Sequence, residues 1–202
     1  MTDKSRNQAS NVDNLLADIR IIPVISIADA SRAVELAGEL AEAGMPVLEI
    51  TLRTAQAIEA IARIAEQVPD VVVGAGTVLS ERDLLNACEA GARFAIAPGC
   101  TGTLYRAAAE RGQASALIPG VATASEIMRG LEHGYQRFKF FPAEAAGGAA
   151  MLRAWQGPFP QVRFIPTGGI GPESAKSYLD LPNVMAVGGS WMVPDWCYTS
   201  RS

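Results

Sequence analysis

The sequence has few of the residues that build metal centres and disulfide frameworks. Its 202 residues include three cysteines, Cys88, Cys100 and Cys197, and one histidine, His133. An odd number of cysteines without a CxxC spacing argues against a disulfide framework or a zinc site. It favours a reducing compartment, so we expect a cytoplasmic protein. A single histidine also excludes a metal site built on several imidazoles.

Long apolar runs and long basic runs are also missing. No stretch reaches the roughly 18 apolar residues of a membrane span, and the polar first ten residues lack the apolar core of a secretory signal. The net charge is −4, which gives little support for a nucleic-acid or anionic-membrane partner. With 49% hydrophobic and 19% charged residues, the chain has enough apolar surface to fold around a core.

Apolar, β-branched segments alternate along the chain with alanine-rich segments of helical periodicity. Strands are predicted at 21–26, 47–52, 71–77, 93–99, 115–120, 137–142, 162–169 and 184–190. Helices are predicted at 11–19, 31–44, 54–67, 80–91, 101–112, 123–134, 149–155 and 172–181. Strands that alternate with helices in this number favour an α/β fold, a compact (β/α)8 TIM barrel, with an open doubly wound sheet as the alternative.

Both ends of the chain depart from this repeating pattern. Residues 1–10 are expected to form a frayed tail, and residues 11–202 a single barrel domain that begins with the short helix at 11–19. After the eighth strand come the letters WMVPDWCYTSRS, which are too few and too irregular for a full helix. The last helix of the barrel is therefore predicted to be missing or shortened, which would expose the seam between the first and last helices unless a neighbouring subunit covers it.

Side chains alternate between the inside of such a barrel and its helix layer, which sets the phase of each strand. In VLEITLR, the leucine and isoleucine side chains should lie beneath the helices, which places Glu49 and Arg53 inside. In RFKFF, two phenylalanines take the helix side and Lys139 faces inward. A structural Glu49–Arg53 ion pair and a solvated edge-strand lysine are the alternatives that this pattern leaves open.

An amine, a carboxylate and a guanidinium inside an apolar barrel suit Schiff-base chemistry. Burial disfavours a charged amine, and the neutral amine is the nucleophile that attacks a ketone. A nearby carboxylate can accept and donate the protons that formation of a Schiff base requires. The guanidinium of Arg53 is suited to a bidentate grip on a substrate carboxylate.

Glycine-rich segments follow the last two predicted strands, TGGI at 167–170 and GGS at 188–190. Barrels often bind phosphate there through backbone N–H groups, although glycine also serves plain tight turns. Thr77 and Pro98 end the third and fourth strands and are weaker candidates, for a substrate contact and an apolar wall. We interpret His133 as a helix-terminus residue and the cysteines and tryptophans as packing residues.

Several motifs together carry a resemblance to a known family: LEITLRT, VGAGTVL, FAIAPG, LIPGVAT, FKFFPAE, GPFPQVRFIPTGGI and VGGSW. They resemble the 2-keto-3-deoxy-6-phosphogluconate (KDPG) aldolase family, which also covers 4-hydroxy-2-oxoglutarate (KHG) aldolase. The resemblance extends from about residue 13 to residue 194. It implies a (β/α)8 barrel, a class I lyase of the Entner–Doudoroff pathway that needs no cofactor, and a cytoplasmic homotrimer. After residue 194 the chain departs from the family, which continues into a further helix.

The residue roles of that family fall on matching positions of this chain. The resemblance implies that Lys139 is the Schiff-base lysine and Glu49 the general acid and base. It implies substrate contacts at Arg53, Thr77, Pro98, Phe141 and Thr167. It implies phosphate contacts at Gly168, Gly169, Gly188, Gly189 and Ser190.

The sequence therefore predicts a lyase that reversibly splits KDPG into pyruvate and glyceraldehyde 3-phosphate. Within the same chemistry, the alternative substrates are KHG and 2-keto-3-deoxy-6-phosphogalactonate. A phosphate-binding barrel isomerase without covalent catalysis, or an inactive binding protein, is the alternative of another class. The position of Lys139 among phenylalanines, together with Glu49 and Arg53, argues against both of these.

Overall fold

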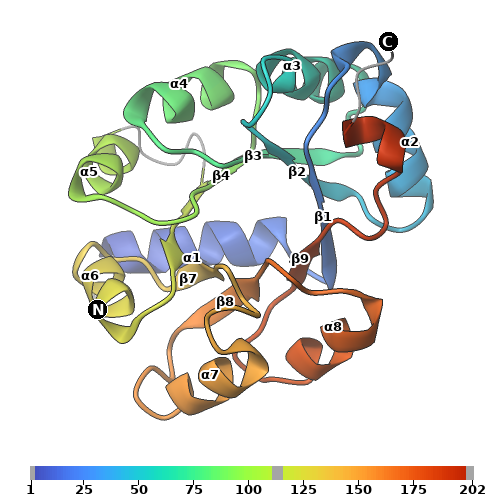
Figure 1. The fold of residues 1–202 in the computed structure, drawn as a ribbon. Coiled ribbons are helices and arrows are strands. Elements are labelled where there is room, and N and C mark those ends of the chain that lie inside the picture. The colour runs from blue at the N-terminus through green and yellow to red at the C-terminus, as the bar shows by residue number, and fades with distance from the viewer. Residues whose placement is uncertain (1–2, 111–115, 199–202) are drawn as a thin grey trace.

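The computed structural model describes residues 3–110 and 116–198, in which parallel strands curl around a common centre and helices cover their outer side (Figure 1). The strands are β1 Ile21–Ile25, β2 Val47–Thr51, β3 Val72–Gly76, β4 Phe94–Ile96, β5 Ala116–Ile118, β6 Gly120–Val121, β7 Arg137–Phe140, β8 Arg163–Pro166 and β9 Val187–Gly189. The helices are α1 Asp3–Leu15, α2 Ala33–Glu42, α3 Ala57–Gln67, α4 Glu81–Glu89, α5 Gly102–Glu110, α6 Ala124–Glu132, α7 Gly148–Trp155 and α8 Pro172–Leu179. Two 3-10 turns are η1 Ala30–Arg32 and η2 Asp195–Tyr198.

The strands form two parallel sheets. One has the order β5-β4-β3-β2-β1-β9 and the other the order β6-β7-β8. At one edge the sheets share a continuous segment, because only Pro119 separates β5 from β6. At the other edge, Thr167 forms an isolated parallel bridge with Gly188. The predicted alternation of parallel strands and helices is thus confirmed as an α/β fold, while complete closure into a (β/α)8 barrel stays a prediction.

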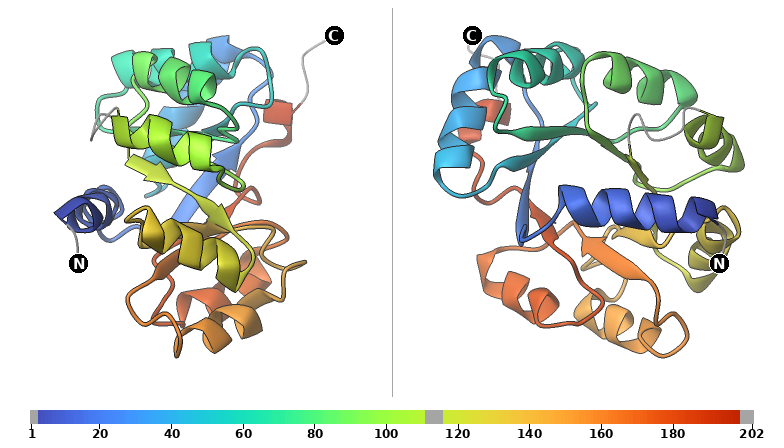
Figure 2. Two further views of the ribbon diagram at one scale, coloured as in Figure 1. Left: turned by 90° about the vertical axis from the view of Figure 1, so that its left-hand side faces the viewer. Right: turned by 180° about the vertical axis from the view of Figure 1, so that it is seen from behind.

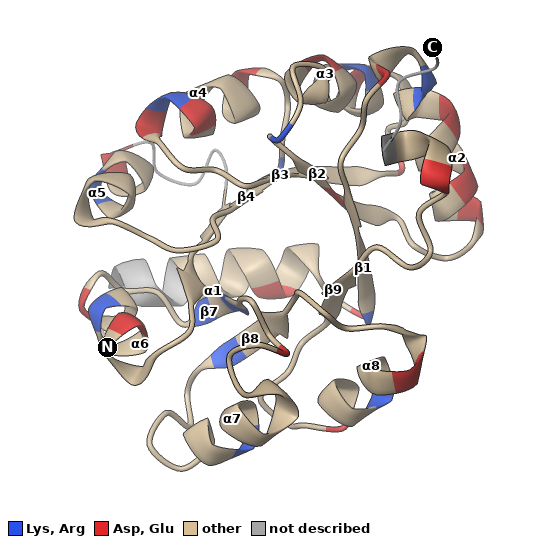
Figure 3. Ribbon diagram, viewed as in Figure 1, with Lys and Arg blue, Asp and Glu red and all other residues tan. Residues whose placement is uncertain are grey.

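Local signals account for the agreement between the predicted and observed helices. Ser80 and Asp83 form a reciprocal capping box at the start of α4, and Thr123 and Glu126 form one at the start of α6. Pro172 occupies the first turn of α8, where its missing N–H costs nothing. Charged residues of both signs lie mainly on the outer helices (Figure 3). Within the described ranges, no helix combines the length and apolar character needed to cross a membrane.

The N-terminal helix corrects two expectations. α1 spans Asp3–Leu15, whereas the sequence pattern predicted a helix at 11–19 after a frayed tail at 1–10. From residue 3 onward, the expected tail is therefore helical. Residues 1–2 of that tail, residues 111–112 of the predicted fifth helix, residue 115 of the predicted fifth strand and residues 199–202 lie outside the described residues.

α1 lies across the N-terminal ends of the strands (Figure 2). Contacts with segments far away in the sequence stabilise it there. Val12 is fully buried and belongs to a core cluster that also contains Ile22 and Phe94. On β7, the Arg137 guanidinium donates to both carboxylate oxygens of Asp13, each at 2.7 Å. Asp13 and Arg137 lie 124 positions apart in sequence, and Phe94 is also far from α1, so the local sequence pattern around the helix did not reveal its extent.

The segment after β9 contains η2 and no α-helix up to residue 198. The expectation of an exposed seam needs correction, because this segment packs against the loop and the 3-10 turn η1 that follow β1. Cys197 is 1% exposed, and its carbonyl oxygen accepts a hydrogen bond from the N–H of Ala28 at 3.0 Å. The Arg32 guanidinium lies over the Trp196 ring, 3.5 Å from its centroid. Part of the seam is therefore covered.

Candidate active site

The predicted amine and carboxylate meet in the interior of the fold. Lys139 on β7 and Glu49 on β2 lie 90 positions apart in sequence, and the Nζ of the lysine donates to Glu49 Oε1 at 2.9 Å. Their side chains are 6% and 1% exposed. The interpretation of Lys139 as a solvated edge lysine is therefore wrong, and so is the Glu49–Arg53 ion pair, because the carboxylate of Glu49 bonds the lysine instead.

Two glycines give this pair its space. A Cβ at Gly76 on β3 would collide with the Oε1 atom of Glu49. Gly120 on β6 is the strand partner of Lys139, and a Cβ there would collide with the backbone of Pro98. Because Gly120 has no side chain, the segment after β4 can pack closely against β6, the strand next to Lys139. Pro98 lies at the carboxyl end of β4, as its strand position predicted.

Two buried polar atoms within the described structure have no hydrogen-bond partner, Glu49 Oε2 and Thr167 Oγ1. A buried acceptor without a partner costs about 1–3 kcal/mol. Such a cost is typical of a site that completes its hydrogen bonds with a ligand. Glu49 thus has one oxygen bonded to an amine and a second oxygen available to a proton donor.

Arg53 and Thr77 lie together just beyond the carboxyl ends of β2 and β3. Arg53 is exposed, so the expectation that it lies inside the barrel with Glu49 is wrong, because β2 ends at Thr51 and the strand alternation does not reach it. Arg53 Nε donates to the hydroxyl of Thr77 at 3.2 Å. Thr77 has a φ of +57°, in the left-handed region that a β-branched residue rarely adopts. Backbone strain of this kind occurs at sites where surrounding contacts fix a functional side chain. Here the strained residue orients the guanidinium.

A cavity of about 170 Å³ opens beside these groups, and its lining contains most of the predicted site residues. It is lined by Val24, Ser26, Arg53, Phe141, Thr167, Gly168, Gly169, Ile170, Gly188, Gly189 and Ser190. Lys139 and Glu49 are not part of the lining. Their connection to the cavity is Phe141, whose ring centroid lies 5.4 Å from Lys139 Nζ. Thr77 and Pro98 are not part of the lining either. Thr77 is hydrogen-bonded to Arg53, which is a lining residue.

The glycine turn after β8 has a defined shape. Gly168 and Gly169 have φ values of +103° and +80°, which favour glycine. The turn is supported from behind, because Ala143 N–H donates to the carbonyl of Thr167 at 2.8 Å and Glu144 N–H to the carbonyl of Gly168 at 3.1 Å. Consecutive backbone N–H groups in such a turn form a concave site for an anion.

The sequence analysis missed three lining residues, Val24, Ser26 and Ile170. Val24 and Ile170 are apolar, and nothing in their local pattern separates a cavity wall from ordinary core. Ser26 did carry a signal, because it is the polar residue that directly follows the apolar strand β1. Functional groups of a barrel lie at that end of each strand.

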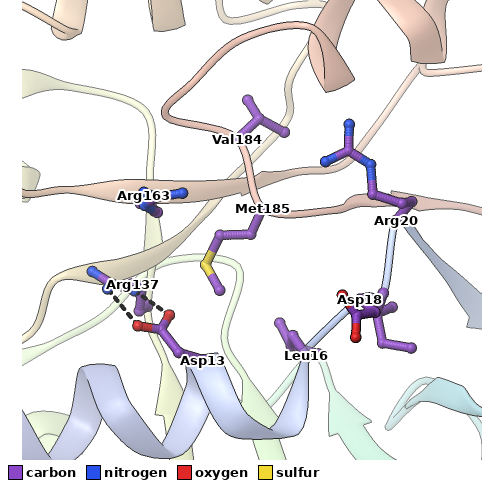
Figure 4. A pocket seen from close by; sticks show the side chains of 9 residues that line it. Asp13, Leu16, Asp18, Arg20, Arg137, Arg163, Val184 and Met185 are labelled. Carbon is purple, nitrogen blue, oxygen red and sulfur yellow. Dashed lines mark hydrogen bonds and ion pairs between the residues drawn. The ribbon is translucent and has the colours of Figure 1, made fainter.

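A larger cavity of about 460 Å³ lies elsewhere, beside α1 (Figure 4). Its lining includes Asp13 and Arg137, the ion pair that fastens α1, and none of the predicted site residues. Two further arginines, Arg20 and Arg163, border it together with Asp18. The two aspartates offset two of the three arginine charges. The predicted site residues that line a cavity all line the smaller one.

The residues interpreted as structural have structural contacts. His133 ends α6, as predicted, and stacks on Tyr105 with ring centroids 4.4 Å apart. Burial raises the pKa of the Cys100 thiol to about 12, although its hydrogen bond with Tyr105 lowers that pKa. A thiol of this kind is a poor nucleophile at neutral pH. Across the described chain, no three His, Cys, Asp or Glu side chains group as ligands for a metal ion.

Comparison with known proteins places this site in a family. Residues 12–200 match the family model described as aldolase, KDPG and KHG aldolase. The chain belongs to the KDPG and KHG aldolase family. The 2-dehydro-3-deoxy-phosphogluconate aldolase of Pseudomonas aeruginosa is 47% identical over 201 residues, which cover 96% of this chain and 90% of that protein. The KHG/KDPG aldolase of Escherichia coli is 48% identical over 189 residues, with coverage of 94% and 88%.

Solved structures of KDPG aldolases have the same fold. The enzyme of Zymomonas mobilis, determined with 3-phosphoglycerate, has a TM-score of 0.87 and 47% identity over 91% of this chain and 87% of that one. The enzyme of Legionella pneumophila has a TM-score of 0.86 and 47% identity, with coverage of 96% and 89%. That second structure holds pyruvate captured as a covalent carbinolamine intermediate. The resemblance seen in the sequence motifs is thereby confirmed.

Proposed function

We propose that this protein is a class I aldolase that reversibly cleaves KDPG into pyruvate and glyceraldehyde 3-phosphate. The observation that carries the proposal is the buried contact of 2.9 Å between Lys139 Nζ and Glu49. Phe141, close to the lysine, lines a cavity together with the glycine turn after β8 and the glycines of β9. Membership of the KDPG and KHG aldolase family supports it. The covalent carbinolamine captured in the Legionella relative supports covalent catalysis by a lysine.

The first half of the reaction forms the iminium. Neutral Lys139 Nζ attacks the C2 ketone, and a bond forms between Nζ and C2 while the ketone oxygen takes the proton of the Glu49 carboxyl group. Glu49, within hydrogen-bond distance of Nζ, accepts a proton from nitrogen. It then returns a proton to the C2 hydroxyl, which leaves as water. The products of this half are an iminium and water.

The second half breaks the carbon–carbon bond. Glu49, directly or through a water molecule, takes the proton of the C4 hydroxyl, and the C3–C4 electron pair moves into the iminium. Glyceraldehyde 3-phosphate leaves, and an enamine remains on Lys139. Protonation of the enamine at C3 and addition of water at C2 release pyruvate and restore the amine. No metal or organic cofactor takes part in these steps.

The remaining predicted residues would hold the two ends of the substrate. Arg53, oriented by Thr77, suits the carboxylate next to the ketone. Pro98 and Phe141 would provide the apolar wall around the reacting carbons, and Thr167 would contact the stereocentre of the aldehyde portion. The phosphate would lie on the backbone N–H groups and hydroxyl of Gly168, Gly169, Gly188, Gly189 and Ser190.

We further propose that the strands close into one (β/α)8 barrel and that residues 11–202 form a single domain. The continuous segment from β5 to β6 and the bridge between Thr167 and Gly188 support closure, because each connects one edge of the two sheets. The family resemblance supports a cytoplasmic homotrimer. Sedimentation equilibrium of the purified protein should give three times the mass of the chain, and a monomer would reject this assembly.

The Escherichia coli relative is named for both KHG and KDPG, so KHG is the second candidate substrate. The test is release of pyruvate from KDPG, 2-keto-3-deoxy-6-phosphogalactonate and KHG, coupled to lactate dehydrogenase. We expect the highest kcat/KM with KDPG. Pyruvate release from none of the three would reject the aldolase and favour the isomerase or the binding protein.

A further inference from the structure

Ser26 lies at the carboxyl end of β1, where its side chain lines the smaller cavity. Its Oγ is 2.7 Å from the hydroxyl oxygen of Thr51, and that oxygen is 3.0 Å from the carbonyl oxygen of Ile25. The strand register explains this proximity. Ile25 pairs with Ile50, so the residues that follow them, Ser26 and Thr51, lie side by side.

The number of protons fixes the direction of both hydrogen bonds. A carbonyl oxygen can only accept, so the bond to Ile25 uses the single hydroxyl proton of Thr51. Ser26 must then donate its own proton to Thr51. Thr51 is 1% exposed, so bulk water does not compete for its hydroxyl. The Ser26 oxygen therefore presents only lone pairs to the cavity.

Ser26 differs from Thr167, another hydroxyl of this lining, because the Ser26 proton is already used, whereas Thr167 Oγ1 has no partner and can donate. Arg53 offers guanidinium donors, and the glycine turn after β8 offers backbone N–H groups, so these parts of the cavity suit anionic oxygen atoms. A lone pair on Ser26 instead favours a hydroxyl group that donates to it, and repels a carboxylate oxygen. The cavity thus distinguishes between a hydroxyl and an anion at the carbon that lies next to Ser26.

The strand order places Ser26 between the reacting groups and the glycines of β9. β1 pairs on one side with β2, where Val24 is opposite Glu49. It pairs on the other side with β9, where Pro23 is opposite Gly189.

In the proposed reaction the C4 hydroxyl gives its proton to Glu49, and the phosphate occupies the glycine turn after β8 and the end of β9. Thr167, proposed to contact the C5 stereocentre, can donate its own proton to the C5 oxygen. The proton of the C5 hydroxyl is then the substrate proton without an assigned acceptor.

We propose that Ser26 is a specificity-determining residue that accepts a hydrogen bond from the C5 hydroxyl of the substrate. This inference rests on the proposed aldolase function. In the addition direction, the same hydroxyl is the C2 hydroxyl of the incoming aldehyde. Ser26 thereby selects hydroxylated phospho-aldehydes over glyoxylate, whose addition to pyruvate places a carboxylate at C5 of KHG.

The test combines loss of the Ser26 hydroxyl with loss of the substrate hydroxyl. Wild type and Ser26→Ala are assayed for addition to saturating pyruvate, with D-glyceraldehyde 3-phosphate or with 3-phosphooxypropanal, which lacks the hydroxyl. Each single change should lower kcat/KM for the aldehyde about tenfold, the cost of one hydrogen bond in a closed site. The two changes together should cost no more than either one, because both remove the same contact.

Multiplicative losses in that cycle would reject the direct contact. Ser26→Thr, which keeps the hydroxyl, should retain the preference for the hydroxylated aldehyde. Trapping of pyruvate by borohydride needs no aldehyde, so it shows whether each variant keeps a working lysine. If the wild type neither traps pyruvate nor adds it to any aldehyde, the proposed function itself fails, and the role of Ser26 fails with it.

A second variant tests the direction of the hydrogen bonds. Thr51→Val removes the acceptor that holds the Ser26 proton, so Ser26 becomes able to donate to an anionic oxygen. The ratio of kcat/KM for glyoxylate to that for D-glyceraldehyde 3-phosphate should rise severalfold. A ratio equal to that of the wild type, in a variant that still traps pyruvate, would contradict the assignment of Ser26 as an acceptor.

Discussion

The carboxylate of Glu49 occupies the space that a side chain at Gly76 would need, because a Cβ there would collide with its Oε1 atom. Gly76 ends β3 and pairs with Thr51, two residues beyond Glu49 on β2. The backbone of β3 thus forms one wall of the catalytic pair and helps to hold Glu49 2.9 Å from Lys139 Nζ. The geometry of the proposed chemistry depends on a residue that has no functional group.

Gly76→Ala should therefore lower kcat by about 100-fold, because displacement of a catalytic group by about 1 Å has a cost of that order. Gly38→Ala is the matched control, since a Cβ at Gly38 on α2 would meet no atom within 4 Å. Steady-state kinetics and circular dichroism of both variants test the expectation. Wild-type kcat in a folded Gly76→Ala protein would show that Glu49 does not depend on this wall.

Arg53→Ala should raise KM for the keto acid strongly. Arg53 is exposed, so solvent screens its contact, and a charge-assisted hydrogen bond of this kind is worth about 1.5–3 kcal/mol, or roughly 10-fold to 150-fold in KM. Arg63→Ala is the control, because Arg63 pairs with Glu59 on the exposed side of α3. If KM stays unchanged in Arg53→Ala, the guanidinium has only a structural role.

The Cys100 thiol should react slowly with alkylating reagents at pH 8. Burial raises its pKa to about 12, against a smaller lowering by Tyr105, so its reactive thiolate is scarce below that pH. Iodoacetamide should label the Cys100 peptide about 100-fold more slowly than a solvated cysteine peptide, with the rate rising as the pH approaches 12. Rapid labelling at pH 8 would contradict the burial of this thiol.

Trp196→Ala should lower the thermal stability of the fold. The contact with Arg32 is worth about 0.5–1 kcal/mol, and lost packing against the core raises the expected loss to about 2 kcal/mol. For a chain of this size, that corresponds to a decrease in Tm of about 4–8 °C. Trp196→Phe retains a ring face and should lose less. An unchanged Tm in Trp196→Ala would mean that the C-terminal segment does not stabilise the seam.

The inward positions were predictable because strand alternation is a local property. The pattern around Glu49 and Lys139 assigned each side chain to a face without knowledge of its partner. Parallel strands then bring their carboxyl ends to the same side of the fold. For that reason the glycines that follow β8 and those that end β9 could be expected near one another, and the structure places them around one cavity.

The features that sequence reasoning missed depend on contacts between distant segments. Nearer the start of α1, the Gln8 side chain donates to the carbonyl of Leu117 at 3.1 Å, and polar residues 3–10 have no apolar periodicity that predicts a helix. The covered seam depends on a bond from Ala28 to Cys197. The role of Ser26 depends on the register between β1 and β2, which alternation within a single strand does not specify.

The most direct test of the whole account is reductive trapping of pyruvate on Lys139. Pyruvate and borohydride together should inactivate the enzyme irreversibly, whereas borohydride alone should not, because it then has no imine to reduce. Mass spectrometry should find one reduced pyruvate on the peptide that contains FKFFP, and Lys139→Arg should abolish trapping and turnover, since a guanidinium stays protonated. Lys176 is the internal control, because it lies exposed on α8 in an ion pair with Asp180. Trapping at Lys176, or substantial turnover by a folded Lys139→Arg protein, would contradict the account.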